Sequence, residues 1–241
     1  MRKLLMAGAA LFALAPVAHA DLKVVQTTSF DSPQYQAAME AMTPQQRANM
    51  EKSGSPLAGI GGHKTTLYFG SGHKVRADLG TVTYLVDASG HQATQLNTKT
   101  HTYRTHAYAP PRASAGQFAA TVKSTGQTKM ILGHRATRYT LSATSASLPG
   151  TIIQGDIWAA ADLPQPPLMS SGGPYAQLQT LIKKIKGYPL ISSIVITGSP
   201  LGNTTFKSVV TSISKTALPA STFAIPAGYH KAGEDADGMG Q

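Results

Sequence analysis

A two-residue alternation of apolar and polar side chains, repeated in short runs, is the feature that most limits how this chain can fold. In 74–79, "KVRADL", three apolar residues alternate with three charged ones. This pattern is typical of an antiparallel strand that is buried on one face. Further strand-like runs are "TVTYLVD", "HQATQL", "HTYRTH", "TKMIL", "RATRYTLSAT", "TIIQGDIWAA", "LISSIVIT" and "TTFKSVVTSIS". We therefore predict a mainly β fold (α+β), with roughly eight to ten strands in meander order whose curved antiparallel sheet forms a half-open barrel.

Two or three short helices are expected to cover the open side of this half-barrel. The segment 32–52 has helical spacing, and "TPQQ" restarts it, so two helices joined at Met42–Thr43 are predicted. Thr43 is a suitable N-cap, and Gln46 stands where a capping box requires it. A later segment, 175–186, places apolar residues along one helical face and lysines mostly off it.

The first residues have the layout of a cleavable export signal. Arg2 and Lys3 precede an apolar stretch, and small residues end it at position 20. We expect residues 1–20 to be a signal peptide, 21–231 a single domain and 232–241 a disordered tail. No later stretch is apolar enough to cross a membrane, so the mature chain is expected in the periplasm, or secreted if the host lacks an outer membrane.

The composition limits which kinds of molecule the protein is expected to bind. The chain has no cysteine, which excludes disulfides and cysteine-bound zinc. Its formal net charge of +10 favours anionic envelope components such as phospholipid or lipopolysaccharide, although a solvated basic surface without a dedicated partner remains an alternative. Nucleic acid is not expected as a partner, because aromatic residues make up only 7% of the chain and the basic residues are dispersed.

Motifs for catalysis and for metal binding are missing from the sequence. No GxSxG nucleophile elbow occurs, and the only carboxylates between 55 and 230 are Asp78, Asp87, Asp156 and Asp162. The histidines follow no HxH or HExxH spacing. We therefore expect no catalytic residue, no metal and no cofactor; a cleft that joined Asp156 to a histidine would favour an enzyme instead.

Several phrases, in their order and spacing, resemble a known family. They are "GHKVRADLG", "TYLVDASGHQATQLNTKTHTYRT", "KSTGQTKMILGHRATRYTL", "GDIWAAADLP" and "TSISKTALPASTFAIPAGYHK", which span 73–231. In this order the chain resembles the periplasmic family of unknown function DUF4412, whose members look like the lipoprotein carriers LolA and LolB. The resemblance implies strands wrapped round helices, with a cavity that holds acyl chains in the carriers. In that arrangement Phe223 and Tyr229 would close the last edge or the mouth of the barrel.

These observations lead to one functional hypothesis and one rival. The hypothesis is a periplasmic, non-enzymatic protein that binds an apolar or amphipathic, lipid-like ligand in the half-barrel cavity. The rival is a structural or interaction module of the cell envelope without a small ligand. The two-residue period of the strand places Ile157 and Trp158 on opposite faces. For Trp158, a role in the hydrophobic core is the alternative to contact with the ligand. The expected cavity-lining residues are Leu132, Tyr139, Ile153, Ile157, Trp158, Leu181, Ile185 and Phe206.

Overall fold

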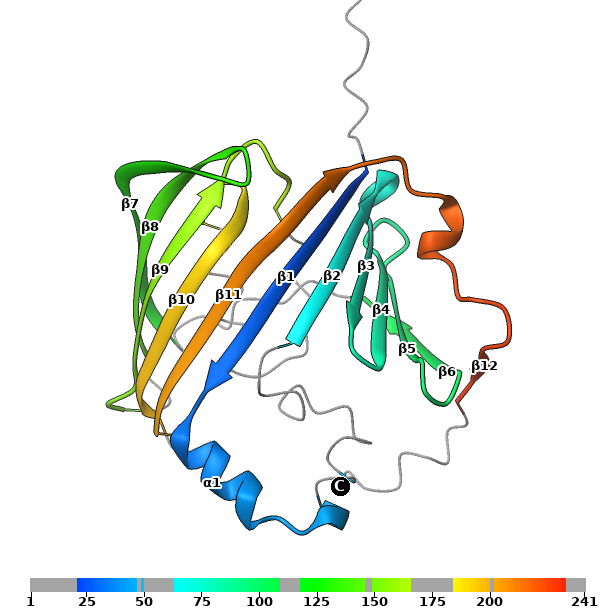
Figure 1. Ribbon diagram of the computed structural model, residues 1–241, viewed down its shortest axis with the longest axis horizontal. Helices are drawn as coiled ribbons and strands as arrows, with labels where there is room; N and C mark the ends of the chain where they lie inside the picture. Colours follow the sequence, from blue (N-terminus) through cyan, green and yellow to red (C-terminus); the bar gives the residue numbers. More distant parts are fainter. Residues whose placement is uncertain are drawn as a thin grey trace, which may run out of the picture.

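The computed structural model describes residues 21–46, 49, 63–108, 118–145, 149–165, 184–199 and 202–232. Its main element is one 12-stranded sheet that curves into a half-open barrel, as predicted (Figure 1). The strands are β1 (Leu22–Asp31), β2 (His63–Gly70), β3 (Lys74–Leu79), β4 (Val82–Asp87), β5 (Gln92–Asn97), β6 (Thr102–Ala107), β7 (Phe118–Ile131), β8 (His134–Ser145), β9 (Ile152–Ala160), β10 (Tyr188–Ser199), β11 (Gly202–Lys215) and β12 (His230–Lys231).

The strand order differs from the single meander predicted from the sequence. Two antiparallel meanders, β1–β6 and β7–β11, join where β1 pairs with β11, and β12 adds to β6 in parallel. The chain therefore crosses from one edge of the sheet to the other between β6 and β7. The sequence analysis assigned no element to Leu22–Asp31, because its adjacent valines and its Thr/Ser run break the two-residue period. This strand is nevertheless one of the two central strands of the sheet.

The β7–β8 turn lies one residue earlier than the sequence suggested. Ile131 pairs with His134, so Leu132 and Gly133 form the two-residue turn with φ of 50° and 80°. Both values are positive, as a type I′ turn requires. The predicted runs "TKMIL" and "RATRYTLSAT" place Leu132 on the strand and leave Gly133–His134 as the turn. This prediction is wrong, because a leucine rarely takes the first position of such a turn.

The first helical region agrees with the prediction. Helix α1 (Pro33–Ala41) has Ser32 as its N-cap, whose Oγ accepts a hydrogen bond from the Tyr35 N–H at 3.3 Å. Thr43 and Gln46 then form the predicted capping box: the Thr43 N–H donates to Gln46 Oε1 at 2.9 Å and the Gln46 N–H donates to Thr43 Oγ1 at 3.2 Å. Within the described part of the chain, no helix is long and apolar enough to cross a membrane.

The second predicted helix, 175–186, lies mostly outside the described residues. Its last three residues, 184–186, are described and are not helical, so a helix that extends to Lys186 is wrong. Gly187, with a φ of 87°, stands directly before β10. The chain therefore turns into the strand at a residue that tolerates a left-handed backbone.

The largest hydrophobic cluster closes one end of the half-barrel, the upper end in Figure 1. It contains the starts of β1, β3, β5, β8 and β10 and the ends of β2, β4 and β9, which meet at one end because neighbouring strands are antiparallel. Tyr188 lies at its centre, 2% exposed, with its ring edge-on to Phe69 at 5.9 Å and its hydroxyl donating to Gln26 Oε1 at 3.2 Å. We call this the closed end.

The segment after β11, Thr216–Tyr229, forms a strap that returns along the sheet to β6. The Leu218 N–H donates to Asp21 Oδ2 at 2.7 Å, and Arg76 Nη1 donates to the carbonyl oxygen of Thr222 at 3.3 Å. The ring of Tyr229 then meets His101 at 5.3 Å beside β12. Tyr229 thus stands at the sheet edge, one of the two places expected for it.

Candidate functional site

On β3 and β4, the sheet face that carries the closed-end cluster becomes more exposed away from that end, whereas on β8, β9 and β10 it stays buried at Leu141, Ile153 and Ile194. On β3 the exposed fraction changes from 6% at Val75 and 0% at Ala77 to 40% at Leu79. On β4, Val86 is buried at 5%, whereas Tyr84 and Val82 on the same face are only half-buried. We call this the core face. From β1 to β4 it is packed at one end of the half-barrel and still partly open to solvent toward the other.

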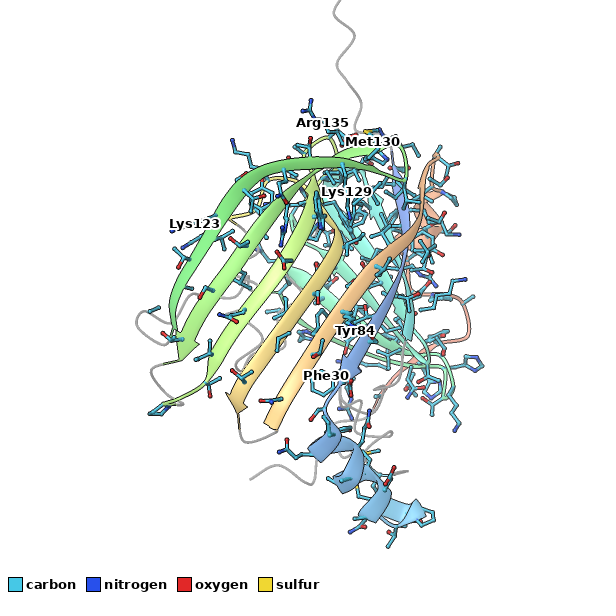
Figure 2. All side chains as sticks on the ribbon, turned by 60° about the vertical axis from the view of Figure 1, so that its left-hand side comes forward. Phe30, Tyr84, Lys123, Lys129, Met130 and Arg135 are labelled. Atoms are coloured by element: carbon cyan, nitrogen blue, oxygen red, sulfur yellow. The ribbon has the colours of Figure 1, made fainter. Side chains whose placement is uncertain are left out.

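Aromatic side chains lie on the core face at the open end. Phe30 and Phe206 are direct partners in the β1–β11 register, and both are half-buried. Phe30 also meets Tyr35 of α1 edge-on at 6.2 Å. Figure 2 shows Phe30 and Tyr84 in the lower half of the sheet, away from the β7–β8 hairpin at the top. Helix α1, which carries Tyr35, follows β1 at this same end (Figure 1).

Two of these aromatic residues were missed by the sequence analysis. Tyr84 alternates with Val82 and Val86 in "TVTYLVD", so the two-residue period of that strand was enough to find it. Phe30 lay in a segment that had received no strand. Only the pairing with β11, about 180 residues away in the chain, places it beside Phe206.

Five of the eight predicted lining residues come together. Tyr139, Ile157 and Ile185 share one small cluster, and Ile153 and Phe206 belong to the adjacent one. Val122 packs against both clusters and so links them. Ile153, Ile157 and Ile185 are at most 6% exposed, whereas Tyr139 and Phe206 are half-buried. The first three are therefore supporting packing, and the latter two retain accessible surface.

The other three predicted residues do not join this group. Trp158 packs against the closed-end cluster, on the opposite side of β9 from Ile157, and Lys129 Nζ lies 4.2 Å from the centre of its ring. This agrees with the predicted opposition of Ile157 and Trp158. Leu132 is 46% exposed in the hairpin turn and lines no described cluster. Leu181 lies outside the described residues.

The core face from β1 to β4 is uncharged in its described side chains, because the charged residues of β3 alternate onto the opposite face. Burial raises the pKa of Tyr84, and it raises that of Tyr188 even more strongly. Both phenols therefore stay neutral at any physiological pH. From β1 to β4 the face offers apolar contact and a few neutral polar groups, such as the Gln26 amide. The exposed Arg104 of β6 lies on the same face, since it pairs with Gln95, the partner of Tyr84.

The carboxylates that the sequence singled out are engaged in structural pairs. Asp156 accepts a hydrogen bond from Arg138 Nε at 2.8 Å and lies 2.7 Å from Arg138 Nη2. Asp162 Oδ2 lies 2.6 Å from His134 Nδ1. Asp156 is thus joined to an arginine rather than to a histidine. No group of three metal-ligating side chains occurs among the residues that the structure describes.

One small pocket lies on the opposite face, beneath the strap. Its volume is about 120 Å³, and its walls include Leu85, Asp87, Gln92, Phe223 and Ile225. Small-molecule sites usually measure roughly 300–1,000 Å³. This pocket is therefore a packing defect between strap and sheet rather than a ligand site.

Comparison with known proteins gives distant structural likeness only. No protein-family model matches the chain, and no curated protein matches it. A solved structure of PNGF-II is similar with a TM-score of 0.41 and 14% identity, covering 90% of this chain and 32% of that chain, about a third of its length. A LolA superfamily protein, NE2245 from Nitrosomonas europaea, is similar with a TM-score of 0.34 and 6% identity, covering 85% of this chain and 90% of that one. Neither similarity is close enough to carry a conclusion about function, and membership of DUF4412 stays an expectation.

Proposed function

We propose that the protein is an exported, non-enzymatic binding protein that holds an apolar or amphipathic, lipid-like molecule in its half-barrel. The observation that carries this proposal is the exposure gradient along the core face of β3 and β4. Toward the open end, Leu79 is 40% exposed and Tyr84, Phe30 and Phe206 are half-buried on the face that forms the core at the other end. Apolar surface of this kind gains free energy when a ligand covers it.

The chemistry of the face favours an acyl chain over a polar ligand. Each buried CH₂ group contributes roughly 0.8 kcal/mol, and the wall from β1 to β4, whose described side chains are uncharged, imposes no desolvation penalty on it. Because the face is packed at one end and open at the other, an amphipathic molecule can place its tail against Phe30, Tyr84 and Phe206 with its head group in water. The formal net charge of +10, or +8 once Arg2 and Lys3 are removed with residues 1–20, favours an anionic head group.

A binding role without catalysis is supported by the side-chain pairs that two of the carboxylates form. Arg138 holds Asp156 and His134 holds Asp162, so neither carboxylate is placed to act as a base on a ligand at the core face. The export-signal layout of residues 1–20 supports the periplasm as the location.

A fluorescent fatty acid tests the proposal directly. We expect saturable binding to the wild-type protein, and roughly tenfold weaker binding after Phe30→Ala or Tyr84→Ala, since each change removes part of an aromatic contact. Val195→Ala is the matched control, because Val195 is 39% exposed and alternates onto the opposite face from Ile194. Saturable binding that Val195→Ala weakens as much as Phe30→Ala would show that the core face is not the site.

The rival hypothesis, an envelope interaction module, has one structural feature in its favour. Ile152, Val195 and Val209 are each about 40% exposed on the face opposite the core face. Polar residues separate them along the strands, so they do not form one continuous patch. The rival predicts that the fluorescent fatty acid does not bind.

A further inference from the structure

The β7–β8 hairpin ends in exposed apolar side chains that the fold does not need. Met130 is 66% exposed and Leu132 is 46% exposed, while Ile131 between them packs against the closed-end cluster. Leu132 also takes a φ of 50°, in the left-handed region that favours glycine and asparagine. Neither burial nor turn chemistry therefore accounts for a leucine at this position.

Basic side chains lie on the same hairpin as these two apolar residues. Arg135 is the direct cross-strand partner of Met130, Lys129 precedes it, and Lys123 lies farther along the same strand. All three are exposed. Figure 2 shows Arg135 and Met130 together at the top of the sheet, with Lys123 lower on β7.

The acidic residues near the hairpin are already paired with other groups. Asp162 is held by His134, and Asp156 is held by Arg138. Among the described residues, Lys123 and Arg135 form no ion pair, and the Lys129 ammonium lies over the Trp158 ring. The hairpin tip, defined as residues 129–135, therefore carries a local positive charge that no described carboxylate cancels.

We propose that the β7–β8 hairpin docks the protein onto an anionic phospholipid surface, with Met130 and Leu132 of its tip entering the interface, and with Arg135 of the tip and Lys123 farther along β7 contacting lipid phosphates. The tip at the end of the edge strand β7 presents two apolar side chains, with Arg135 beside Met130 and Lys123 farther along the strand. A fluid membrane surface needs no matching shape to receive them. Charge complementarity selects anionic lipid. This inference concerns a surface separate from the core face and does not depend on the proposed ligand.

Vesicle flotation of the full exported chain tests whether Lys123 and Arg135 contribute to membrane binding. We expect binding to phosphatidylglycerol-containing vesicles, weak binding to phosphatidylcholine vesicles, and a loss of binding as salt increases. Lys123→Gln with Arg135→Gln should weaken binding roughly thirtyfold, from about 1 kcal/mol for each basic residue at the surface. Lys207→Gln with Lys231→Gln removes the same charge from exposed sites away from the tip and is the matched control. Equal losses in the two double variants would overturn the proposal, because net charge alone would then explain binding.

A single-site label tests the apolar contact. The chain has no cysteine, so Leu132→Cys gives a unique attachment point for an environment-sensitive dye, and Val195→Cys gives the control. With phosphatidylglycerol vesicles, the dye at position 132 should shift to the blue while the dye at position 195 stays unchanged. Leu132→Asn, which suits the turn better than leucine does, should fold normally and weaken flotation roughly tenfold. An unshifted dye at position 132, or unchanged flotation of Leu132→Asn, would contradict insertion of the tip.

Discussion

Replacing Gly70 by alanine tests how the C-terminal strap packs on the sheet. A Cβ at Gly70 would lie 2.6 Å from both Cε2 and Cζ of the Phe223 ring. The backbone at this position, with φ −107° and ψ 170°, suits alanine, so the cost comes from the collision alone. Overpacking of this kind costs roughly 1–3 kcal/mol. Alanine also lowers the entropy of the unfolded chain, which stabilises the protein by about 0.4–1 kcal/mol. We therefore expect the free energy of unfolding to fall by about 1–2 kcal/mol.

Phe223→Ala supplies the second arm of a double-mutant cycle measured by urea unfolding. The half-buried ring should contribute about 1–2 kcal/mol, less than the roughly 3–5 kcal/mol of a fully buried phenylalanine. In the absence of the ring, Gly70→Ala should become neutral or slightly stabilising, so the two changes should couple by about 1–2 kcal/mol. Changes that add to within about 0.5 kcal/mol would refute the packing of Phe223 over Gly70.

Three further outcomes follow from burial and pairing. Ile194→Ala should lower the free energy of unfolding by roughly 2–4 kcal/mol, since Ile194 is 1% exposed, whereas Val195→Ala on the other face should change it by about 0.5 kcal/mol or less, both by urea unfolding. Tyr188→Phe should lower unfolding stability by about 1 kcal/mol in the same assay, because it removes a buried hydroxyl donor. For Asp162, burial opposes ionisation, but the hydrogen bond and the charge of His134 hold the pKa of the carboxyl below its usual 3.8. Its stabilising contribution is complete above the unfolded-state pKa and is lost as the pH falls through the lowered folded-state pKa, so Asp162→Asn should destabilise the protein near neutral pH and make little difference in strong acid.

The parts of the fold that depend on local chemistry were predictable from the sequence. The alternation in Lys74–Leu79 identified β3, and the Thr43–Gln46 pair identified a capping box that the structure contains. The opposition of Ile157 and Trp158 followed from strand phase alone and holds across β9. Each of these features is set by residues within one element, so the sequence pattern is sufficient.

The parts that depend on distant pairing were not predictable. The position of β1 between β2 and β11 comes from contacts between chain ends, and loop closure over such distances leaves no local pattern. The aromatic residues of the open end meet only through that pairing, which joins Phe30 to Phe206. The β7–β8 turn was misplaced because Leu132 occupies a position that turn statistics assign to other residues.

Native mass spectrometry of the exported protein, purified gently from the cell envelope, tests the central claim most directly. The account predicts a second species whose added mass corresponds to one bound molecule, which organic extraction then identifies as an acyl-chain compound. Phe30→Ala with Tyr84→Ala should carry less of it than the Val195→Ala control. A protein of unmodified mass, unchanged after incubation with envelope lipids, would contradict the claim that the half-barrel is a binding site.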